Sequence, residues 1–206
     1  PRETAAGERR IALVPESAKK LVEQGNEVVI EKARSASVDF PDAAYTAAGA
    51  RIAADAGEVL AGSDLVLKIQ PPSESEIASL RTGTVLVAIL QPFQNGDTVR
   101  RLSEKSVTSF SLDLLPRITR AQAMDVLSSM STIAGYKGVL IAAAALPKMV
   151  PLLMTAAGTL KPARFLILGV GVAGLQAIAT ARRLGAVVEA FDIRPAVKEQ
   201  VESLGA

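Results

Sequence analysis

Short apolar runs alternate with amphipathic segments through the first half of the chain. Val28-Val29-Ile30 and Leu65-Val66-Leu67 are two such runs, and an expected helix follows each, the first opened by Pro41 and closed by Gly49. Continuous apolar strands that alternate with helices predict a parallel, doubly wound sheet, because such a sheet is covered on both faces. The expected strands are Glu27–Glu31, Arg51–Ala53, Asp64–Ile69, Thr84–Leu90 and Val107–Ser111, and the expected helices are Pro15–Gln24, Asp42–Ala48, Ala54–Ala61, Glu74–Leu80 and Asp97–Lys105.

The second half of the chain begins with a long helical segment. A helix is expected from Arg120 to about Leu146, either continuous or as two helices joined near Gly135, and it would bridge two domains. After this helix, Pro147, Pro151, Gly158 and Pro162 indicate an irregular linker to the second domain. The pattern predicts two doubly wound, Rossmann-like α/β domains: an N-terminal domain at 1–119, a bridging helix and linker at 120–162, and the truncated start of a second domain at 163–206.

The second domain holds only strand, helix, strand and helix. Two parallel strands cannot bury both faces of a sheet. We therefore expect the chain to continue past Ala206.

The most apolar stretch runs from Gly138 to Leu160. Its longest uncharged piece, Gly138–Pro147, is too short to span a bilayer, which takes about 20 residues. We interpret the stretch as a buried helix followed by a short second helix, with a membrane span as the alternative. No signal peptide pattern is visible, so a cytoplasmic location is the expectation.

Composition narrows the chemistry. The chain has no Cys, His or Trp, so a His general base, a Cys or Ser nucleophile paired with His, and a Cys/His zinc site are all excluded within it, and no metal site is expected. Aromatic residues make up only 3%, which disfavours base-stacking contacts with nucleic acid. With 23 basic and 21 acidic residues, the charge is nearly balanced and gives no basic surface for nucleic acid.

The strongest motif is a glycine-rich turn. The apolar run Arg164–Leu168 leads into Gly169-Val170-Gly171-Val172-Ala173-Gly174, which is G-x-G-x-x-G between a strand and a helix. In this pattern the first glycine allows the tight turn, the second lets a pyrophosphate approach, and the third lets helix and strand pack closely. The phosphates would lie at the helix N-terminus, where free N–H groups favour anions.

A second apolar strand, Ala186–Phe191, ends in Asp192. Asp192 lies as far after Gly174 as the carboxylate that binds the adenosine ribose hydroxyls does in dinucleotide-binding domains. A carboxylate at this position repels a 2′-phosphate, so NAD(H) is predicted over NADP(H). Arg194 qualifies that preference, because an Arg nearby can accommodate the phosphate. The structural alternative is that Asp192 caps the helix after Arg194-Pro195.

A polar segment, Leu114–Ser129, follows the last strand of the first half. Gln122 and Asp125 are three residues apart on the expected helix, Ser128 continues their face, and Arg117 lies just before the helix. These side chains are candidate ligands. The alternative is structural, because Thr119-x-x-Gln122 fits a capping box and Asp125 suits an early helical turn.

Together these residues resemble the NAD(H)-binding component, the first domain of the alpha subunit, of proton-translocating NAD(P) transhydrogenase. The resemblance covers essentially the whole chain, and alanine dehydrogenase of the same superfamily shares it more loosely. It rests on Pro1-Arg2-Glu3-Thr4, Gly7–Arg10, Arg117–Ser129, Ala134-Gly135-Tyr136-Lys137, Gly169–Gln176 and Phe191-Asp192-x-Arg194-Pro195.

The resemblance implies two doubly wound domains with NAD(H) in the cleft, a first strand before Pro1, and a homodimer. It implies that Arg117, Gln122, Asp125 and Ser128 contact the nicotinamide end, with Gln122, Asp125 and Arg117 in the catalytic role. The loop and adenosine site would comprise Gly169, Gly171, Val172, Ala173, Gly174, Asp192, Ile193 and Arg194.

The implied activity is Re/Si-specific hydride transfer between NADH and NADP⁺. The NADP(H) would be bound on a partner component, and membrane-embedded partners would conduct the protons. The chain would then lie in the cytoplasm, peripheral to the inner face of the membrane. Transfer between two nicotinamides makes no proton at the reacting carbons, so catalysis reduces largely to positioning and needs no histidine.

Two alternatives remain. In alanine dehydrogenase a Lys and a His handle protons, but the corresponding positions here are Gln70 and Gln91, although the carboxylate-binding Arg has a counterpart in Arg10. A non-catalytic NAD-binding regulatory module would keep Gly169–Gly174 and Asp192 without needing Gln122.

Overall fold

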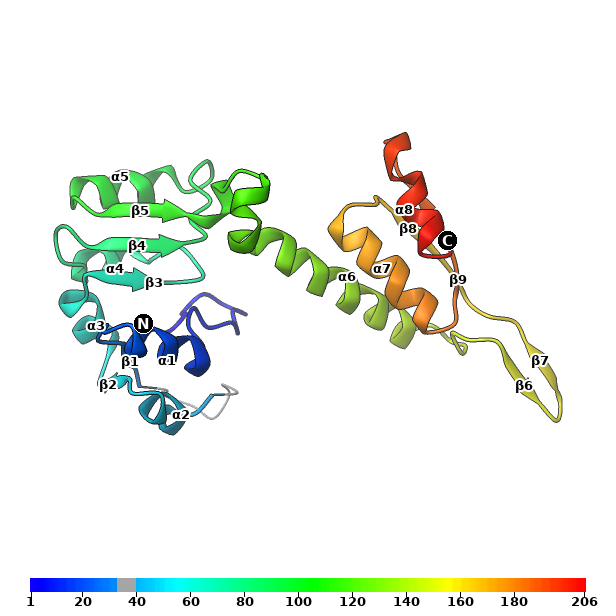
Figure 1. Ribbon diagram of the computed structural model, residues 1–206, viewed down its shortest axis with the longest axis horizontal. Helices are drawn as coiled ribbons and strands as arrows, with labels where there is room; N and C mark the ends of the chain where they lie inside the picture. The colour runs from blue at the N-terminus through cyan, green and yellow to red at the C-terminus, as the bar shows by residue number, and fades with distance from the viewer. Residues whose placement is uncertain (33–39) are drawn as a thin grey trace. The chain divides into compact units, whose positions relative to one another are not determined.

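The computed structural model describes residues 1–32 and 40–206 of the chain. Its contacts divide into two compact units, Pro1–Met124 and Asp125–Ala206. In both units short strands alternate with helices (Figure 1). The prediction of an α/β fold with parallel sheets is confirmed, whereas the domain boundaries expected from the sequence stay predictions.

The first unit contains two parallel sheets among its described residues. One sheet has the order β1-β2 and the other β3-β4-β5. Leu86 and Ala88 of β4 are fully buried, so the core lies around this central strand. The strands are β1 (Val29–Glu31), β2 (Arg51–Ala53), β3 (Leu65–Leu67), β4 (Val85–Ala88) and β5 (Thr108–Ser111), and the helices are α1 (Pro15–Glu23), α2 (Asp42–Ala47), α3 (Ala56–Gly62), α4 (Glu74–Ser79) and α5 (Gly96–Glu104).

Local sequence signals explain where these helices begin. The α3 helix starts after Asp55, whose side chain accepts the Glu58 N–H. A complete capping box starts α4, because Ser73 accepts the Glu76 N–H and Glu76 accepts the Ser73 N–H. Two short 3₁₀ helices, η1 (Leu112–Leu114) and η2 (Thr119–Met124), end the unit.

The second unit is built around the helix pair α6 and α7 and one parallel strand pair. Phe165 of β8 and Val188 of β9 point into a core that includes the fully buried Ile178 and Ala181 of α7. The elements are α6 (Val126–Ala145), β6 (Leu153–Thr155), β7 (Gly158–Leu160), β8 (Arg164–Leu168), α7 (Val172–Arg183), β9 (Val187–Phe191), η3 (Pro195–Val197) and α8 (Lys198–Ser203).

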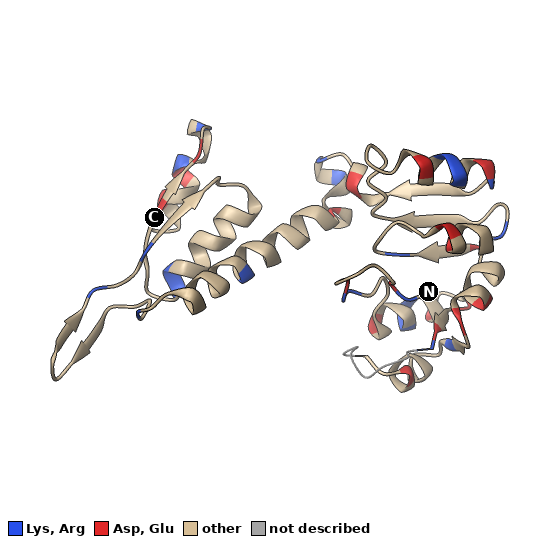
Figure 2. Ribbon diagram, turned by 180° about the vertical axis from the view of Figure 1, so that it is seen from behind, with Lys and Arg blue, Asp and Glu red and all other residues tan. Residues whose placement is uncertain are grey.

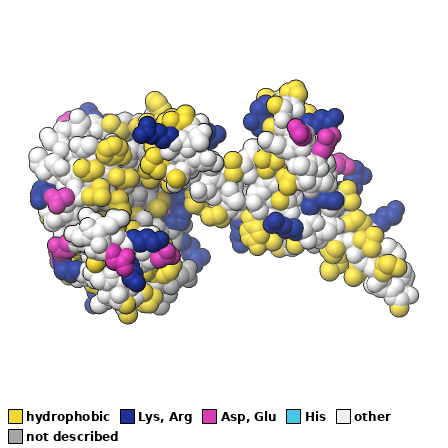
Figure 3. Space-filling model, viewed as in Figure 1, with side chains coloured by type: hydrophobic (Ala, Val, Ile, Leu, Met, Phe, Trp, Pro, Cys, Tyr) yellow, Lys and Arg dark blue, Asp and Glu magenta, His cyan; other side chains and the backbone are white. Residues whose placement is uncertain are grey.

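Two expectations for this region are wrong. The expected helix from Arg120 does not run through, because the 3₁₀ helix η2 ends at Met124 and α6 starts after Asp125. The expected short helix after Pro147 is instead the antiparallel hairpin β6–β7. Pro147 and Pro151, which precede the hairpin, lack the backbone N–H that a helix would need at their positions. Gly158, at the start of β7, has φ +132°. Exposed apolar side chains gather on this hairpin, including Met154 and Leu160 (Figure 3).

The α6 helix is also not the buried helix that was expected. Within the part of the chain that the structure describes, only Gly135 and Val139 of this helix are buried. Lys137 is its sole charged residue, so the helix is almost entirely uncharged in Figure 2. By length and composition alone it could cross a membrane, but one helix that passes this test is weak evidence for a span.

Candidate functional site

The glycine-rich turn has the geometry that its sequence predicts. Gly169 has φ +90°, a conformation that side chains rarely adopt, and it turns the chain out of β8. A Cβ on Gly174 would lie 2.0 Å from the Gly169 carbonyl oxygen, so the third glycine is required for the close approach of α7 to the turn.

The first turn of α7 is free to bind an anion. Gly171 is the N-cap and supplies no side-chain acceptor to the first N–H groups of the helix. A Cβ built on Gly171 would meet nothing within 4 Å, so a ligand can approach its backbone closely. Uncapped N–H groups beside open space are the arrangement that binds pyrophosphate at a helix N-terminus.

Asp192 lies at the end of β9, against this turn. Its carboxylate accepts the Val170 N–H at 2.7 Å and the Arg194 N–H at 2.9 Å. The Arg194 guanidinium donates to both carboxylate oxygens, at 2.9 and 3.0 Å, and also to the Val170 carbonyl at 3.2 Å. These hydrogen bonds, above all those from the Arg194 side chain, hold the pKa of Asp192 well below its usual range.

The lowered pKa keeps Asp192 ionised, and the residue does not cap a helix as the structural alternative supposed. The N-cap of η3 is Arg194, which makes no side-chain capping bond. An ionised carboxylate offers about four lone pairs, and four hydrogen bonds already fill them. A ribose diol that bound here would therefore have to displace the Arg194 side chain from the Asp192 carboxylate or share the carboxylate oxygens with it. Ile193, between the two residues, is 87% exposed.

Asp125 is the N-cap of α6. Its two carboxylate oxygens accept the Ser128 N–H at 2.9 Å and the Ser128 hydroxyl at 2.6 Å. The structural alternative of a capping box at Thr119 and Gln122 is not found, because those residues lie in η2 and the N-cap of α6 is Asp125. Gln122 is therefore not committed to capping α6.

The predicted site residues divide between the two units. Arg117 and Gln122 are exposed residues of the first unit, the former between η1 and η2 and the latter within η2. All the other predicted ligands belong to the second unit: Asp125, Ser128, Gly169, Gly171, Val172, Ala173, Gly174, Asp192, Ile193 and Arg194.

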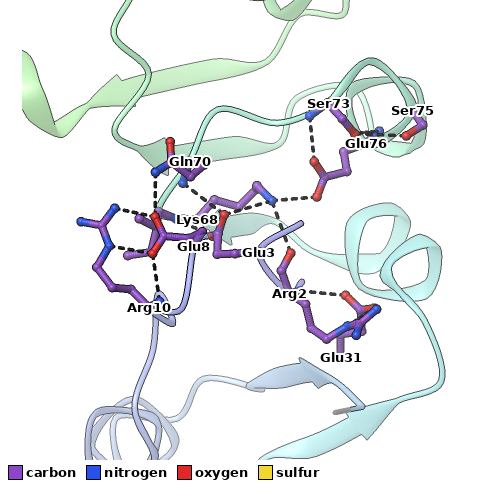
Figure 4. A network of polar contacts seen from close by, with 11 residues as sticks. Arg2, Glu3, Glu8, Arg10, Glu31, Lys68, Gln70, Ser73, Ser75 and Glu76 are labelled. Atoms are coloured by element: carbon purple, nitrogen blue, oxygen red, sulfur yellow. Dashed lines mark hydrogen bonds and ion pairs between the residues drawn. The ribbon is translucent and has the colours of Figure 1, made fainter. Parts of the chain in front are cut away.

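The first unit contains a buried ionic network that the sequence analysis did not single out (Figure 4). Lys68, whose side chain is 1% exposed, lies between Glu76 at 2.7 Å and Glu3 at 3.6 Å. Burial raises the pKa of Glu76, but the hydrogen bonds from Lys68 and Ser73 outweigh it and leave the pKa below its usual value. Lys68 directly follows the apolar run of β3, which is the one sequence signal that could have identified it.

Glu8 joins Arg10 to Gln70 in a neighbouring part of this network. Arg10 donates to both Glu8 carboxylate oxygens, at 2.8 and 2.5 Å, and the Gln70 side chain donates to the same carboxylate at 2.7 Å (Figure 4). The Arg10 hydrogen bond lowers the pKa of Glu8 to about 2. Arg10 therefore already holds a carboxylate that belongs to the chain itself.

A cavity of about 680 Å³ lies in the first unit, lined by residues of both β1 and β3. These two strands are not paired with each other in the described residues. None of the predicted cofactor-binding residues lines the cavity, so we do not assign it to the nucleotide. The strand that the sequence resemblance implies before Pro1 stays a prediction.

Two protein-family models match the sequence of this chain. The model of the alanine dehydrogenase/PNT N-terminal domain matches residues 1–134, and the model of the alanine dehydrogenase/PNT C-terminal domain matches residues 138–206. The chain belongs to the alanine dehydrogenase/PNT family. Together the two matches cover nearly all of the chain and extend over both units.

Individual relatives favour the transhydrogenase branch of the alanine dehydrogenase/PNT family. The chain is 49% identical to the first part of NAD(P) transhydrogenase subunit alpha of Rhodospirillum rubrum, over all of this chain and 55% of that protein. The crystal structure of transhydrogenase from Sinorhizobium meliloti matches with a TM-score of 0.95 and 47% identity, over all of this chain and 59% of that one. Alanine dehydrogenase of Halomonas elongata is 32% identical, over 93% of this chain and 52% of that protein. The predicted resemblance is confirmed, and the chain spans little more than half the length of these relatives.

Proposed function

We propose that the protein containing this chain transfers hydride between NADH and NADP⁺, and that this chain supplies part of the NAD(H) site. One observation carries the proposal: an uncapped α7 N-terminus and an ionised Asp192 meet at the same glycine-rich turn. The names of the similar transhydrogenase proteins agree with it.

The residues present fit a dinucleotide. The open backbone at Gly171 and the N–H groups of Val172 and Ala173 would hold the pyrophosphate. Asp192 would accept hydrogen bonds from the adenosine ribose hydroxyls, with Ile193 and Arg194 beside it. The nicotinamide ring of the bound NADH supplies the hydride.

The residues proposed to contact the nicotinamide end would act by holding the ring in position for hydride transfer. Asp125 and Ser128 form one hydrogen-bonded pair at the start of α6, and Gln122 and Arg117 are the other residues proposed to contact the ring. Gln122 would hold the ribose and carboxamide, while Arg117 and Asp125 fix the orientation of the ring. No proton has to be held or moved, which accords with the absence of histidine from the chain.

Partners follow from the same proposal. The NADP(H) would lie on a separate component, and membrane-embedded components would conduct protons in this Re/Si-specific, proton-translocating reaction. The NAD(H) component would act as a homodimer in the cytoplasm, at the inner face of the membrane.

The test mixes the full-length protein with an NADP(H)-binding component and measures hydride transfer from NADPH to an NAD⁺ analogue. A parallel assay supplies L-alanine and NAD⁺ alone. We expect turnover in the first assay only, and turnover only in the second would refute the proposal. Two contacts disfavour the alternative of an alanine dehydrogenase. The Arg10 guanidinium is already hydrogen-bonded to the Glu8 carboxylate, and the amide side chain of Gln70 cannot exchange a proton.

A single substitution separates this function from a non-catalytic NAD-binding module. Gln122→Asn shortens the side chain without changing its chemistry, so we expect hydride transfer to fall about 100-fold or more while NADH affinity stays nearly constant. Transfer at the wild-type rate would show that Gln122 does not position the ring.

A further inference from the structure

The α6 helix touches the phosphate turn through backbone atoms at Gly135. A Cβ on Gly135 would lie 2.1 Å from the Ala173 carbonyl oxygen and 2.9 Å from the Ala173 carbonyl carbon. Ala173 belongs to the first turn of α7, inside the G-x-G-x-x-G motif. Both neighbouring atoms are backbone, so neither can rotate away as the end of a flexible side chain would.

The same face of α6 carries the candidate nicotinamide ligand Ser128. Ser128 precedes Gly135 by seven residues, which is within about 20° of two full helical turns. Val139 follows Gly135 by four residues, is 3% exposed and packs in the core cluster that includes α7 residues Ala177 and Ile178. Ser128, Gly135 and Val139 therefore lie along one stripe that faces α7.

The distance along this stripe is fixed by helix geometry. Seven residues rise about 10 Å along an α-helix, so Ser128 lies about that far along α6 from the contact with the phosphate turn. Asp125 is held to Ser128 by two hydrogen bonds, so the pair moves with the helix as one body.

We propose that Gly135 is a positioning residue that sets the offset of the Asp125–Ser128 pair from the phosphate turn. The inference rests on the proposed function, because it assigns the pair to the nicotinamide end of a nucleotide whose pyrophosphate would be held by Gly171, Val172 and Ala173. The α7 side of the contact is anchored separately, since Gly174 packs against the Gly169 carbonyl. A side chain at position 135 therefore displaces α6, and with it the pair, while the phosphate turn stays in place.

The size of the displacement predicts the size of the effect. Contacts of a Cβ below 3.0 Å are essentially never seen, so a contact of 2.1 Å requires a shift of roughly 1 Å. A misplacement of about 1 Å from a remote substitution can cost about 100-fold in rate when catalysis depends on positioning. Binding of the pyrophosphate and adenosine, which uses α7 and β9, should change much less.

The experiment compares four variants of the full-length protein, each with the NADP(H)-binding component. Gly135→Ala introduces the displacement. Val139→Leu enlarges the same interface one turn further on and should displace α6 less, whereas Val139→Ala loosens that interface without pushing the helices apart. Gly138→Ala is the matched control, because that glycine is on the same helix and a Cβ there meets nothing within 4 Å.

For Gly135→Ala we expect the rate of hydride transfer at saturating nucleotide to fall about 100-fold, with NADH affinity within about threefold of wild type. The transfer rate of Val139→Leu should fall about tenfold, while the rates of Val139→Ala and Gly138→Ala should stay within about threefold of wild type. Unfolding midpoints are measured for all four, so that a loss of stability is seen separately from a loss of rate. If Gly135→Ala does not fold, the contrast between Val139→Leu and Val139→Ala decides the matter.

Two results would overturn the inference alone: transfer by Gly135→Ala within threefold of wild type, or equal losses in Val139→Leu and Val139→Ala. Failure of the wild-type protein and of Gly138→Ala to transfer hydride would instead refute the proposed function.

Discussion

Each unit contains a carboxylate that is clamped by an arginine two residues later, and the two clamps differ in what else they hold. Glu8 and Arg10 form one, and Asp192 and Arg194 form the other. The carboxylates are nearly equally buried, with 7% and 8% of their side chains exposed. In both cases the Arg hydrogen bond is the main cause of a lowered pKa.

The surroundings distinguish a structural clamp from a binding clamp. Glu8 receives its remaining side-chain hydrogen bond from Gln70, so it ties the N-terminal segment to the residues after β3. Asp192 receives its remaining hydrogen bond from the Val170 backbone, within the turn that presents uncapped N–H groups to open space. A strongly lowered carboxylate pKa therefore does not by itself indicate a ligand site, whereas its location beside unused donors does.

Glu8→Gln should produce the largest change and should affect stability alone. The substitution leaves Arg10 without its charged partner, and Arg10 is only about one-third exposed, so we expect a loss of about 2 kcal/mol in the free energy of unfolding. NADH affinity should not change. Denaturant unfolding and NADH titration of the full-length protein measure the two quantities.

Glu16→Gln is the matched control, because Glu16 pairs with Lys20 on the surface of α1 and its side chain is 79% exposed. It should have little effect on the unfolding midpoint. A loss of NADH affinity in Glu8→Gln would show that the first clamp is also part of a binding site.

Asp192→Asn should produce the opposite result. The amide keeps the size of the side chain but loses the charge and half of the acceptor capacity, so NADH affinity should fall about 10- to 30-fold through the lost ribose hydrogen bonds. Glu189→Gln, an exposed position on β9, is the control. Unchanged NADH affinity in Asp192→Asn would mean that Asp192 only stabilises the loop.

The sequence predicted the parts that local chemistry determines. The G-x-G-x-x-G turn and the strand that ends at Asp192 are encoded within one continuous segment, and the structure has the expected conformation at Gly169 and Gly174. The alternation of strands and helices in the first unit was also predicted correctly, because each apolar run lies between turn residues.

The errors have two sources, a choice between local signals and contacts between residues distant in sequence. The start of α6 was misplaced because Thr119-x-x-Gln122 and Asp125-x-x-Ser128 both have the spacing of a cap, and α6 uses the second. The Gly135 contact with Ala173 and the ion pair of Lys68 with Glu3 join residues far apart in sequence, which no periodicity reveals.

The pH dependence of stability should separate the two clamps further. The folded-state pKa of Glu8 is lowered from 4.5 to about 2, so its contribution is complete above about pH 4.5 and is lost as the pH falls toward 2. Thermal unfolding of wild type should therefore lose several degrees over that range. Glu8→Gln should lose less, because it has no such group to protonate. Parallel curves for the two proteins would contradict the lowered pKa.

Arg194→Ala should produce the smallest change, because two effects oppose each other. The substitution removes a side chain that lies beside the adenosine site, but it also frees the two Asp192 lone pairs that the guanidinium occupies. We therefore expect NADH affinity within about threefold of wild type, in contrast to Asp192→Asn. Arg183→Ala, an exposed residue at the end of α7, controls for the change in net charge. A loss greater than tenfold would show that Arg194 holds the nucleotide directly, whereas a clear gain in affinity would show that the arginine occupies the place of the ribose until the nucleotide binds.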